Sequence, residues 1–461
     1  MAGHKLGVRF AVMACAVAVA AGVFAWCIYR PDLTIKVGTA SISQTLCDEI
    51  FISGLDGKRV FAEEIQPRRG IHILLKRLRY SIDRQRRQVV TTWAGHFESV
   101  AAYQEGYGCA LGELGSVAPE VAPGAAPAGT QENPAMPVAP ANAKLAAALD
   151  RAFAEPLRPP YRRVRAIVVM RDGKIVAERY AQGIGPDTPL LSYSVSKSVV
   201  NALIGILVRD GKLNLFAPAP VSAWKSPADP RHAITLDQLL RMTSGLKLEE
   251  SDTGFDPVSR MLFCERDMAA YAEKAGLKYA PGQTFEYTSG NTLIACAILR
   301  DAVGGHRDDV LRFAQRELFG PVGMQHVTVE FDAAGTPIGS TRIFASACDW
   351  ARFGELYRND GVVDGKRILP PGWVAYSTKP TLGSDYGSGF WVNAGQAENA
   401  RGRVEAGMPA DAFFASGLFG QRVVVIPSQR LVIARFGVTI DPPDFDIRGL
   451  IRLVSDVVAA Q

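Results

Sequence analysis

The chain has 461 residues, enough for two or three domains, and its 48% hydrophobic and 21% charged residues are ordinary for a globular protein. A net charge of +5 is too small to indicate nucleic-acid binding, and the basic residues are not interleaved with aromatic residues. The six histidines are scattered without a His-Glu-x-x-His motif, and the seven cysteines show no Cys-x-x-Cys spacing. We therefore expect neither a metal nor another cofactor.

The amino terminus carries an unbroken apolar run over residues 10–29, preceded by Lys5 and Arg9. A run of this length can cross a bilayer as a helix, and Trp26 and Tyr29 suit its interface. We expect residues 1–30 to form an uncleaved transmembrane signal anchor in the inner (cytoplasmic) membrane, with the rest of the chain periplasmic or otherwise extracytoplasmic. A cleaved signal peptide, cut near residues 18–21, is the alternative.

Residues 31–115 are expected to form a small membrane-proximal α+β module, with a strand over 88–94 and a short helix over 97–103. Cys47 and Cys109 bracket this module and could form a disulfide in an oxidising compartment. Residues 116–143 are dominated by Ala, Pro and Gly. Such a segment cannot pack a core, so we interpret it as a linker.

Residues 144–461 are long enough for one substantial domain. The patterns predict strands over 165–169, 174–180, 389–392, 422–426 and 431–436. They predict helices over 144–153, 195–209, 236–243, 267–275, 291–303, 308–318, 346–358 and 445–459. Strands at both ends and helices between them indicate an α+β domain, with an antiparallel sheet flanked by helices and an inserted helical lobe. A cleft between sheet and lobe is a natural site.

The most informative motif is Ser194-Val-Ser-Lys197, at the start of the predicted amphipathic helix 195–209. Residues three apart on a helix are neighbours, so the hydroxyl and the amine can meet. A base beside a serine turns a weak nucleophile into a strong one. Two further Ser-x-x-Lys pairs, at 222–225 and 244–247, lie in a Pro-rich stretch and after a helix end, and we interpret both as unrelated to catalysis.

Two later segments offer partners for this pair. Tyr287 precedes a predicted helix and can lean into a cleft, where a neighbouring ammonium would make it a candidate general base. The alternative is a core tyrosine with a satisfied hydroxyl. Residues 414–421 contain small residues that let backbone approach a substrate, and an N–H there with that of Ser194 could form an oxyanion hole. The alternative is a Gly-rich entry to a strand.

Taken in order, Ser194-Val-Ser-Lys197, Tyr287-Thr-Ser289 and Ala415-Ser-Gly417 resemble the three signatures of the serine β-lactamase and penicillin-binding-protein superfamily, in its class C-like branch. Within that branch, residues 160–440 look most like the 6-aminohexanoate-dimer hydrolase and related esterase group. The resemblance implies an acylated nucleophile, a lysine that holds or removes its proton, a tyrosine that relays this proton, and an oxyanion site. By this resemblance, Ser194 is the acylated nucleophile, Lys197 holds or removes its proton, and Tyr287 relays that proton. The N–H groups of Ser194 and Leu418 form the oxyanion site, and the substrate site is lined by Ser289, Ala415, Ser416 and Gly417.

Two departures from the family pattern narrow this expectation. Ser289 stands where the second motif usually has Asn, and Ala415 stands where the third usually has Lys or His. A cation there pairs with the carboxylate of β-lactams and peptidoglycan stem peptides. We therefore expect a serine hydrolase of small-molecule or peptide-like amides or esters. A DD-peptidase or weak class C-like β-lactamase, and a catalytically silent binding or sensor protein, remain alternatives.

An acidic segment, residues 249–252 with Asp256, could meet a substrate amine. A solvated loop is the simpler interpretation.

Overall fold

The computed structural model describes residue 13 and residues 30–112, 136–251, 253–440 and 443–460. Within these ranges, no helix has both the length and the apolar character that a membrane span requires. Apart from Met13 and Arg30, the expected anchor over 1–30 lies outside the described residues, as does most of the expected linker.

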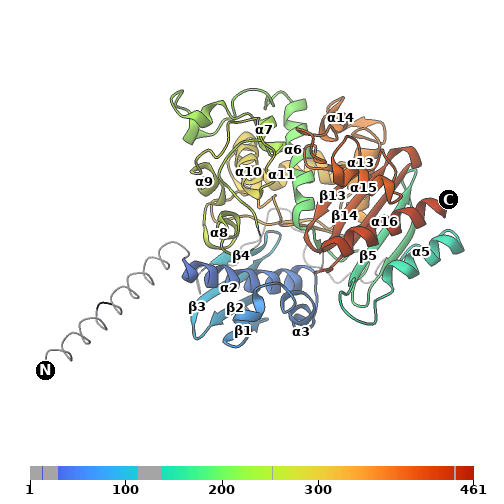
Figure 1. Cartoon of the computed structure of the whole chain (residues 1–461), viewed down its shortest axis with the longest axis horizontal. Coiled ribbons are helices and arrows are strands. Elements are labelled where there is room, and N and C mark those ends of the chain that lie inside the picture. The colour runs from blue at the N-terminus through green and yellow to red at the C-terminus, as the bar shows by residue number, and fades with distance from the viewer. Residues whose placement is uncertain (1–12, 14–29, 113–135, 252, 441–442, 461) are drawn as a thin grey trace.

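The amino-terminal module packs a long helix, α2, against a four-stranded antiparallel sheet with the order β1-β2-β3-β4 (Figure 1). The predicted helix over 97–103 is wrong, because this segment is the strand β3, which pairs with both β2 and β4. Pairing on both sides satisfies the backbone of β3 and overrides its local preference. The helices and strands of the module are α2 (Pro31–Cys47), α3 (Gly57–Val60), α4 (Ile71–Leu75), β1 (Leu78–Asp83), β2 (Gln88–Trp93), β3 (His96–Gln104) and β4 (Gly108–Gly112).

The larger domain is built on a six-stranded antiparallel sheet with the order β12-β13-β14-β15-β5-β6. Its centre joins the two ends of the domain, because β15 pairs with β5 from Leu431 opposite Arg171 to Gly437 opposite Val164. The predicted sheet from both termini is therefore confirmed. The strands of this sheet are β5 (Val164–Arg171), β6 (Lys174–Tyr180), β12 (Trp391–Val392), β13 (Phe413–Gly417), β14 (Gln421–Ile426) and β15 (Leu431–Gly437).

Short strands pair away from the main sheet. β7 (Leu190–Leu191), β9 (Ile343–Ala345) and β8 (Thr328–Val329) form a small antiparallel sheet beside the start of the helix α6 (Ser196–Arg209). β10 (Val362–Val363) pairs with β11 (Lys366–Arg367).

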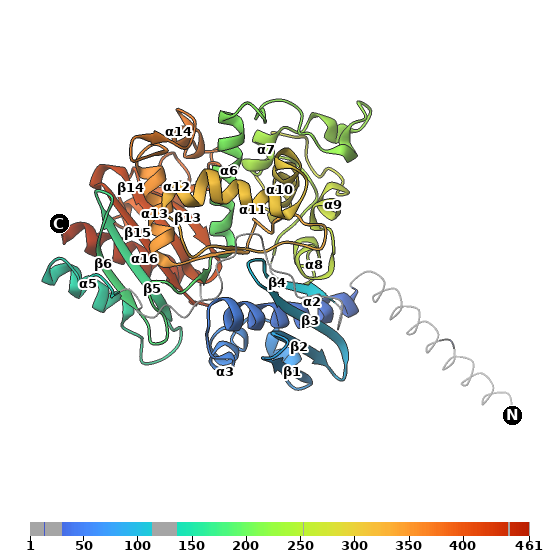
Figure 2. The same cartoon turned by 180° about the vertical axis from the view of Figure 1, so that it is seen from behind.

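Helices cover both faces of the large sheet (Figures 1 and 2). On one face, α5 and α16 bury apolar residues such as Leu149 and Val454. On the other face, α13 and the helical lobe enclose the larger core. The helices of this domain are α5 (Ala143–Phe153), α6 (Ser196–Arg209), α7 (Leu236–Leu240), α8 (Pro257–Cys264), α9 (Met268–Glu273), α10 (Ser289–Val303), α11 (Arg307–Ala314), α12 (Gly320–Val322), α13 (Ala347–Arg358), α14 (Trp373–Ser377), α15 (Glu398–Glu405) and α16 (Pro443–Ala459).

The helix α6 differs from its predicted amphipathic form, because every residue from 196 to 207 is buried. A helix that is covered on all sides belongs to the core of a large domain. Its polar residues are paired: Asn201 Oδ1 accepts hydrogen bonds from Tyr357 Oη (2.6 Å), Trp373 Nε1 (2.9 Å) and Ser377 Oγ (3.1 Å). These bonds fix α6, and hence the residues at its start, relative to the rest of the domain.

A cavity of about 870 Å³ lies between the module and the helical lobe, lined by residues that include Lys36, Tyr107 and Arg307. Ser194 and Lys197 are not among its lining residues.

Candidate active site

Ser194 lies in a single 3₁₀ turn, Tyr193–Val195, directly before α6. Tyr193 has φ 47°, a left-handed conformation that is uncommon for a residue with a bulky side chain. Ser196 braces the turn, because its Oγ lies 2.8 Å from Ser192 Oγ and accepts a hydrogen bond from the N–H of Ile343 (3.0 Å). The local structure therefore presents Ser194 at a fixed, sharp entry to a buried helix.

Lys197 is buried one turn further along α6, with only 3% of its surface exposed. Its Nζ lies 2.9 Å from Ser194 Oγ, 3.1 Å from Ser289 Oγ and 2.9 Å from the carbonyl oxygen of Ser340. The expected meeting of the hydroxyl and the amine is therefore present in the structure. Sequence reasoning missed Ser340, whose carbonyl carries no signal in the sequence.

Two of the partners of Lys197 can only accept a hydrogen bond in this arrangement. The Ser340 carbonyl has no hydrogen to donate. Ser289 Oγ donates its hydrogen to Glu250 Oε1 (3.1 Å), so its remaining capacity toward Lys197 is as an acceptor. If the amine is neutral, its two hydrogens can serve these acceptors and its lone pair can face Ser194. In that neutral state, the amine has the geometry to accept a proton from the Ser194 hydroxyl.

Glu250 is placed by α10, whose first residue is Ser289. The second carboxylate oxygen, Oε2, accepts the backbone N–H of Ser289 at 2.5 Å. A carboxylate at a helix N-terminus is favoured because unpaired N–H groups point toward it. The interpretation of residues 249–252 with Asp256 as a solvated loop fits Glu249, which is exposed and pairs with Lys278 (2.9 Å). It is wrong for Glu250, and for Asp256, which is buried and caps the start of α8. Asp252 lies outside the described residues.

Tyr287 lies just before α10, and its ring centroid is 4.9 Å from Lys197 Nζ. The ring also contacts Tyr386 edge-on at 5.6 Å and Trp391 at 5.7 Å. This position beside the lysine is the one expected from the sequence. The two aromatic neighbours hold the Tyr287 ring in place beside Lys197.

The third motif lies at the end of β13, where β12 pairs only with Phe413 and Phe414. Gly417 comes close to the turn that holds Ser194: a Cβ at this position would lie 2.2 Å from the Ser192 carbonyl oxygen and 3.2 Å from the Ser194 nitrogen. Only glycine permits such an approach. Ala415 has no exposed surface and belongs to the larger core, so its expected place in the lining of the substrate site is not supported. Ser416 is half-buried, and Leu418 is 42% exposed. The strand thus brings the backbone of residues 417–418 beside Ser194.

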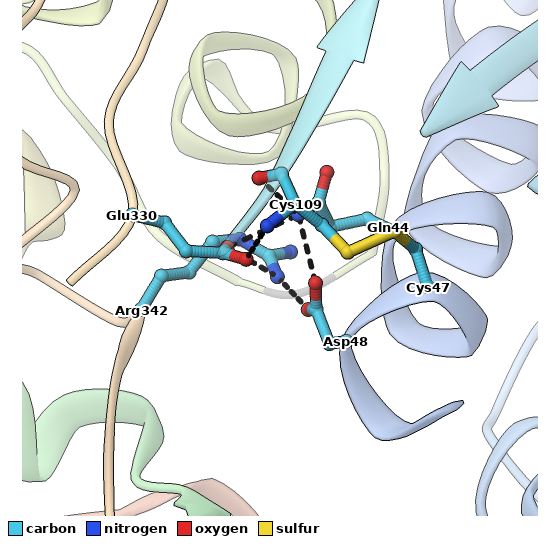
Figure 3. Close-up of a disulfide and its surroundings, with 6 residues drawn as sticks. All are labelled: Gln44, Cys47, Asp48, Cys109, Glu330 and Arg342. Carbon is cyan, nitrogen blue, oxygen red and sulfur yellow. Dashed lines mark hydrogen bonds and ion pairs between the residues drawn. A yellow bond between two sulfur atoms is a disulfide. The ribbon is translucent and has the colours of Figure 1, made fainter. Parts of the chain in front are cut away.

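Among the described residues, one cluster has the atom types of a metal site: Asp48, Cys109 and Glu330. Figure 3 shows that it does not fit an ion, because the Cys109 sulfur is bonded to Cys47 and Arg342 occupies the centre of the acidic pair. This Cys47–Cys109 disulfide, with Cα atoms 6.1 Å apart, is the pair expected from the sequence.

Comparison with known proteins agrees with this architecture. The family model "Beta-lactamase" matches residues 149–454. A curated relative, the 6-aminohexanoate-dimer hydrolase of Paenarthrobacter ureafaciens, is 24% identical over 228 residues, which are 45% of this chain and 55% of the relative. The chain thus spans about half the length of the curated relative that it matches.

Solved structures share the fold at low identity. A class C β-lactamase from Rhodobacter sphaeroides is 16% identical with a TM-score of 0.51, covering 69% of this chain and 100% of that one. A family VIII carboxylesterase is 16% identical with a TM-score of 0.53, covering 71% and 100%. The fold, the order of the motifs and the family match lead to one conclusion: this chain belongs to the β-lactamase family.

Proposed function

We propose that the protein is a serine hydrolase that cleaves amide or ester bonds through an acyl-enzyme on Ser194. The observation that supports this most directly is the buried Lys197 Nζ, 2.9 Å from Ser194 Oγ. A nucleophile within hydrogen-bond reach of a base, with that base oriented by further groups, is the arrangement that nucleophilic catalysis needs.

In the proposed reaction, Ser194 Oγ attacks the substrate carbonyl carbon while Lys197 takes the hydroxyl proton. The negative charge that develops on the carbonyl oxygen is met by the N–H groups of Ser194 and Leu418. Tyr287 donates its phenolic proton to the leaving nitrogen or oxygen and takes the proton that Lys197 holds, and the bond to the leaving group breaks. Water then attacks the acyl-enzyme while Tyr287 takes a proton from it and passes its own phenolic proton to Lys197. Lys197 returns that proton to the Ser194 oxygen as the acid leaves, which restores Ser194.

We further propose that the acyl donor lacks the carboxylate that β-lactams carry. Ala415 is fully buried and offers no charge where the third motif usually places a cation. A binding pocket without that cation gives a carboxylate-bearing substrate no ion pair to offset its desolvation. Neutral esters and linear amides are therefore the expected substrates.

The test is covalent labelling of the purified full-length chain with a fluorophosphonate probe, followed by turnover of esters, linear amides, D-amino-acid peptides and β-lactams. We expect labelling on Ser194, its loss in Ser194→Ala, and turnover of esters or linear amides. Labelling that persists in Ser194→Ala would refute the nucleophile. Stable acylation by a fluorescent penicillin would favour a DD-peptidase or β-lactamase, and an unlabelled wild-type chain would favour a silent binding protein.

We also propose that the apolar run over residues 10–29 anchors the protein in the inner membrane, with the hydrolase domain on the extracytoplasmic side. The Cys47–Cys109 disulfide supports this side, because disulfides persist in oxidising compartments. Protease added to intact spheroplasts should degrade the hydrolase domain. Protection until the membrane is permeabilised would contradict the proposed orientation.

A further inference from the structure

The turn that holds Ser194 is contacted by the amino-terminal module, which the family match does not include. The Tyr193 hydroxyl donates to Glu64 Oε1 (3.0 Å) and accepts from Arg68 Nη2 (3.2 Å). Burial and the charge of Glu64 raise the pKa of Tyr193 well above its ordinary value, so this phenol is a neutral donor. A hydrogen bond to a charged acceptor is stronger than one between neutral groups.

Tyr193 and Arg68 also contact Phe419, which directly follows Leu418. Phe419 has φ 58°, and its ring packs edge-on against that of Tyr193 with centroids 5.4 Å apart. Arg68 lies 5.1 Å from the Phe419 ring centroid. Residues held in the left-handed region cost energy and persist only where the surroundings fix them. Tyr193 precedes the nucleophile and Phe419 follows Leu418, so both strained positions adjoin the reacting atoms.

Glu64 is itself held from both sides of the domain boundary. Its side chain is 1% exposed, and its two oxygens contact Arg68 of the module (3.2 Å) and Arg165 of β5 (3.1 Å). Arg165 also pairs with Glu49 of the module at 2.9 Å. Buried charges that are paired and hydrogen-bonded have few alternative arrangements, because a broken pair leaves an unpaired buried charge.

A second contact reaches the segment that carries the Ser340 carbonyl, the partner of Lys197. Glu330 and Arg342 bracket this segment and both contact the module (Figure 3). Glu330 Oε1 accepts the N–H of Cys109 (2.6 Å), Gln44 Nε2 donates to Glu330 Oε2 (3.0 Å), and Arg342 pairs with Asp48. The module therefore contacts the segments before Ser194, after Leu418 and around Ser340.

We propose that the module serves as a fixed support of the active site, in which Glu64 and Arg68 are positioning residues that set the geometry of Ser194 and the Leu418 N–H through Tyr193 and Phe419. This inference rests on the proposed function, because it concerns the same nucleophile and oxyanion site. It assigns residues 31–112 a direct part in the rate of acylation, in addition to any part in location.

The test compares two matched deletions of one hydroxyl in the full-length chain. Tyr193→Phe removes the bond to Glu64 and keeps the ring against Phe419. Tyr107→Phe removes a bond of the same kind across the same boundary, from Tyr107 to Asp308 (2.5 Å), at the cavity whose lining does not include Ser194 or Lys197. Glu64→Gln is the corresponding change within the module. The readouts are the rate of fluorophosphonate labelling, kcat and KM, thermal unfolding, and hydrogen exchange of residues 190–197 and 414–421.

We expect Tyr193→Phe and Glu64→Gln to slow labelling and kcat by about tenfold, with faster exchange in both segments, because small displacements of reacting groups are costly. Tyr107→Phe should match the wild type in labelling and exchange. Equal slowing in all three variants would point to general destabilisation and overturn the proposal, as would unchanged labelling and exchange in the first two. A wild type that does not label would refute the proposed function, and the exchange comparison would still decide the positioning role.

Discussion

Glu250→Gln replaces one carboxylate oxygen by an NH₂ group and should reverse the direction of the hydrogen bond between Lys197 Nζ and Ser289 Oγ. In the wild type, Glu250 Oε2 accepts the Ser289 N–H, and Oε1 accepts the Ser289 hydroxyl. In the variant, the backbone N–H keeps an oxygen opposite it, so the amide NH₂ must face Ser289 Oγ. Because that NH₂ can only donate, the Ser289 hydroxyl is freed to donate to the lone pair of Lys197 and compete with Ser194.

The magnitude follows from the number and kind of bonds affected. One hydrogen bond to a charged group contributes about 1.5–3 kcal/mol, so its loss corresponds to roughly 10–150-fold in the acylation rate. Ser289→Ala removes the hydroxyl through which the change acts. We therefore expect Glu250→Gln to slow acylation by this factor when residue 289 is Ser, and to have almost no further effect in the Ser289→Ala background.

The assay is the rate constant of fluorophosphonate labelling for the wild type, both single variants and the double variant. Glu249→Gln is the matched control, because Glu249 is adjacent but pairs with Lys278 at the surface, and it should label at the wild-type rate. Additive effects of the two changes, or a Glu250→Gln variant as fast as Glu249→Gln, would refute the role of Glu250 in orienting Ser289 toward Lys197.

Three further outcomes are expected. Gly417→Ala should slow labelling by about 100-fold or more, because the new Cβ would lie 2.2 Å from the Ser192 carbonyl oxygen. The control Gly402→Ala, which has open space at its Cβ, should label at the wild-type rate. Equal labelling rates in the two variants would contradict the close approach of β13 to Ser192. Replacing Cys47 and Cys109 by Ser should lower the free energy of unfolding of the module by about 4 kcal/mol, since the disulfide closes a loop with a sequence separation of 62. The measurement is urea unfolding followed through hydrogen exchange of module peptides. Unchanged urea midpoints would contradict this stabilisation by the disulfide. Burial and the charge of Asp48 raise the pKa of Glu330 well above 4.5, so the folded chain keeps a proton that the unfolded chain loses, and its stability falls as pH rises from about 4.5. Between pH 4.5 and 7, the free energy of unfolding of Glu330→Gln should therefore rise relative to that of the wild type, by at most about 1.4 kcal/mol per pH unit, as measured by denaturant titrations. A fall relative to the wild type would contradict this and would show that Glu330 is ionised and paired with Arg342.

Local patterns were sufficient for five of the six strands of the main sheet and for the meeting of Ser194 with Lys197, because these depend on short-range periodicity and spacing. They missed β13 (Phe413–Gly417), whose small residues give no strand signal and whose pairing with β12 and β14 is not visible locally. The segment 97–103 misled the prediction, since its strand conformation depends on partners on both sides that no local pattern reveals. The charged neighbours of Glu250 favour a solvated loop, and only the approach of α10 distinguishes Glu250 from Glu249. The contact of Glu64 with Tyr193 joins residues 129 positions apart, and nothing in either segment predicts it.

The pairing of β15 with β5 also constrains the order in which this protein can fold as it is synthesised. More than half of the chain separates Leu431 from its partner Arg171, so one edge of β5 stays unpaired until nearly the whole chain has left the ribosome. Contacts between such distant segments form slowly, and an exposed strand edge invites pairing with other chains. The module, with a core and disulfide of its own, can be complete long before that point. When β15 arrives, the turn Tyr193–Val195 therefore meets a module that has already folded.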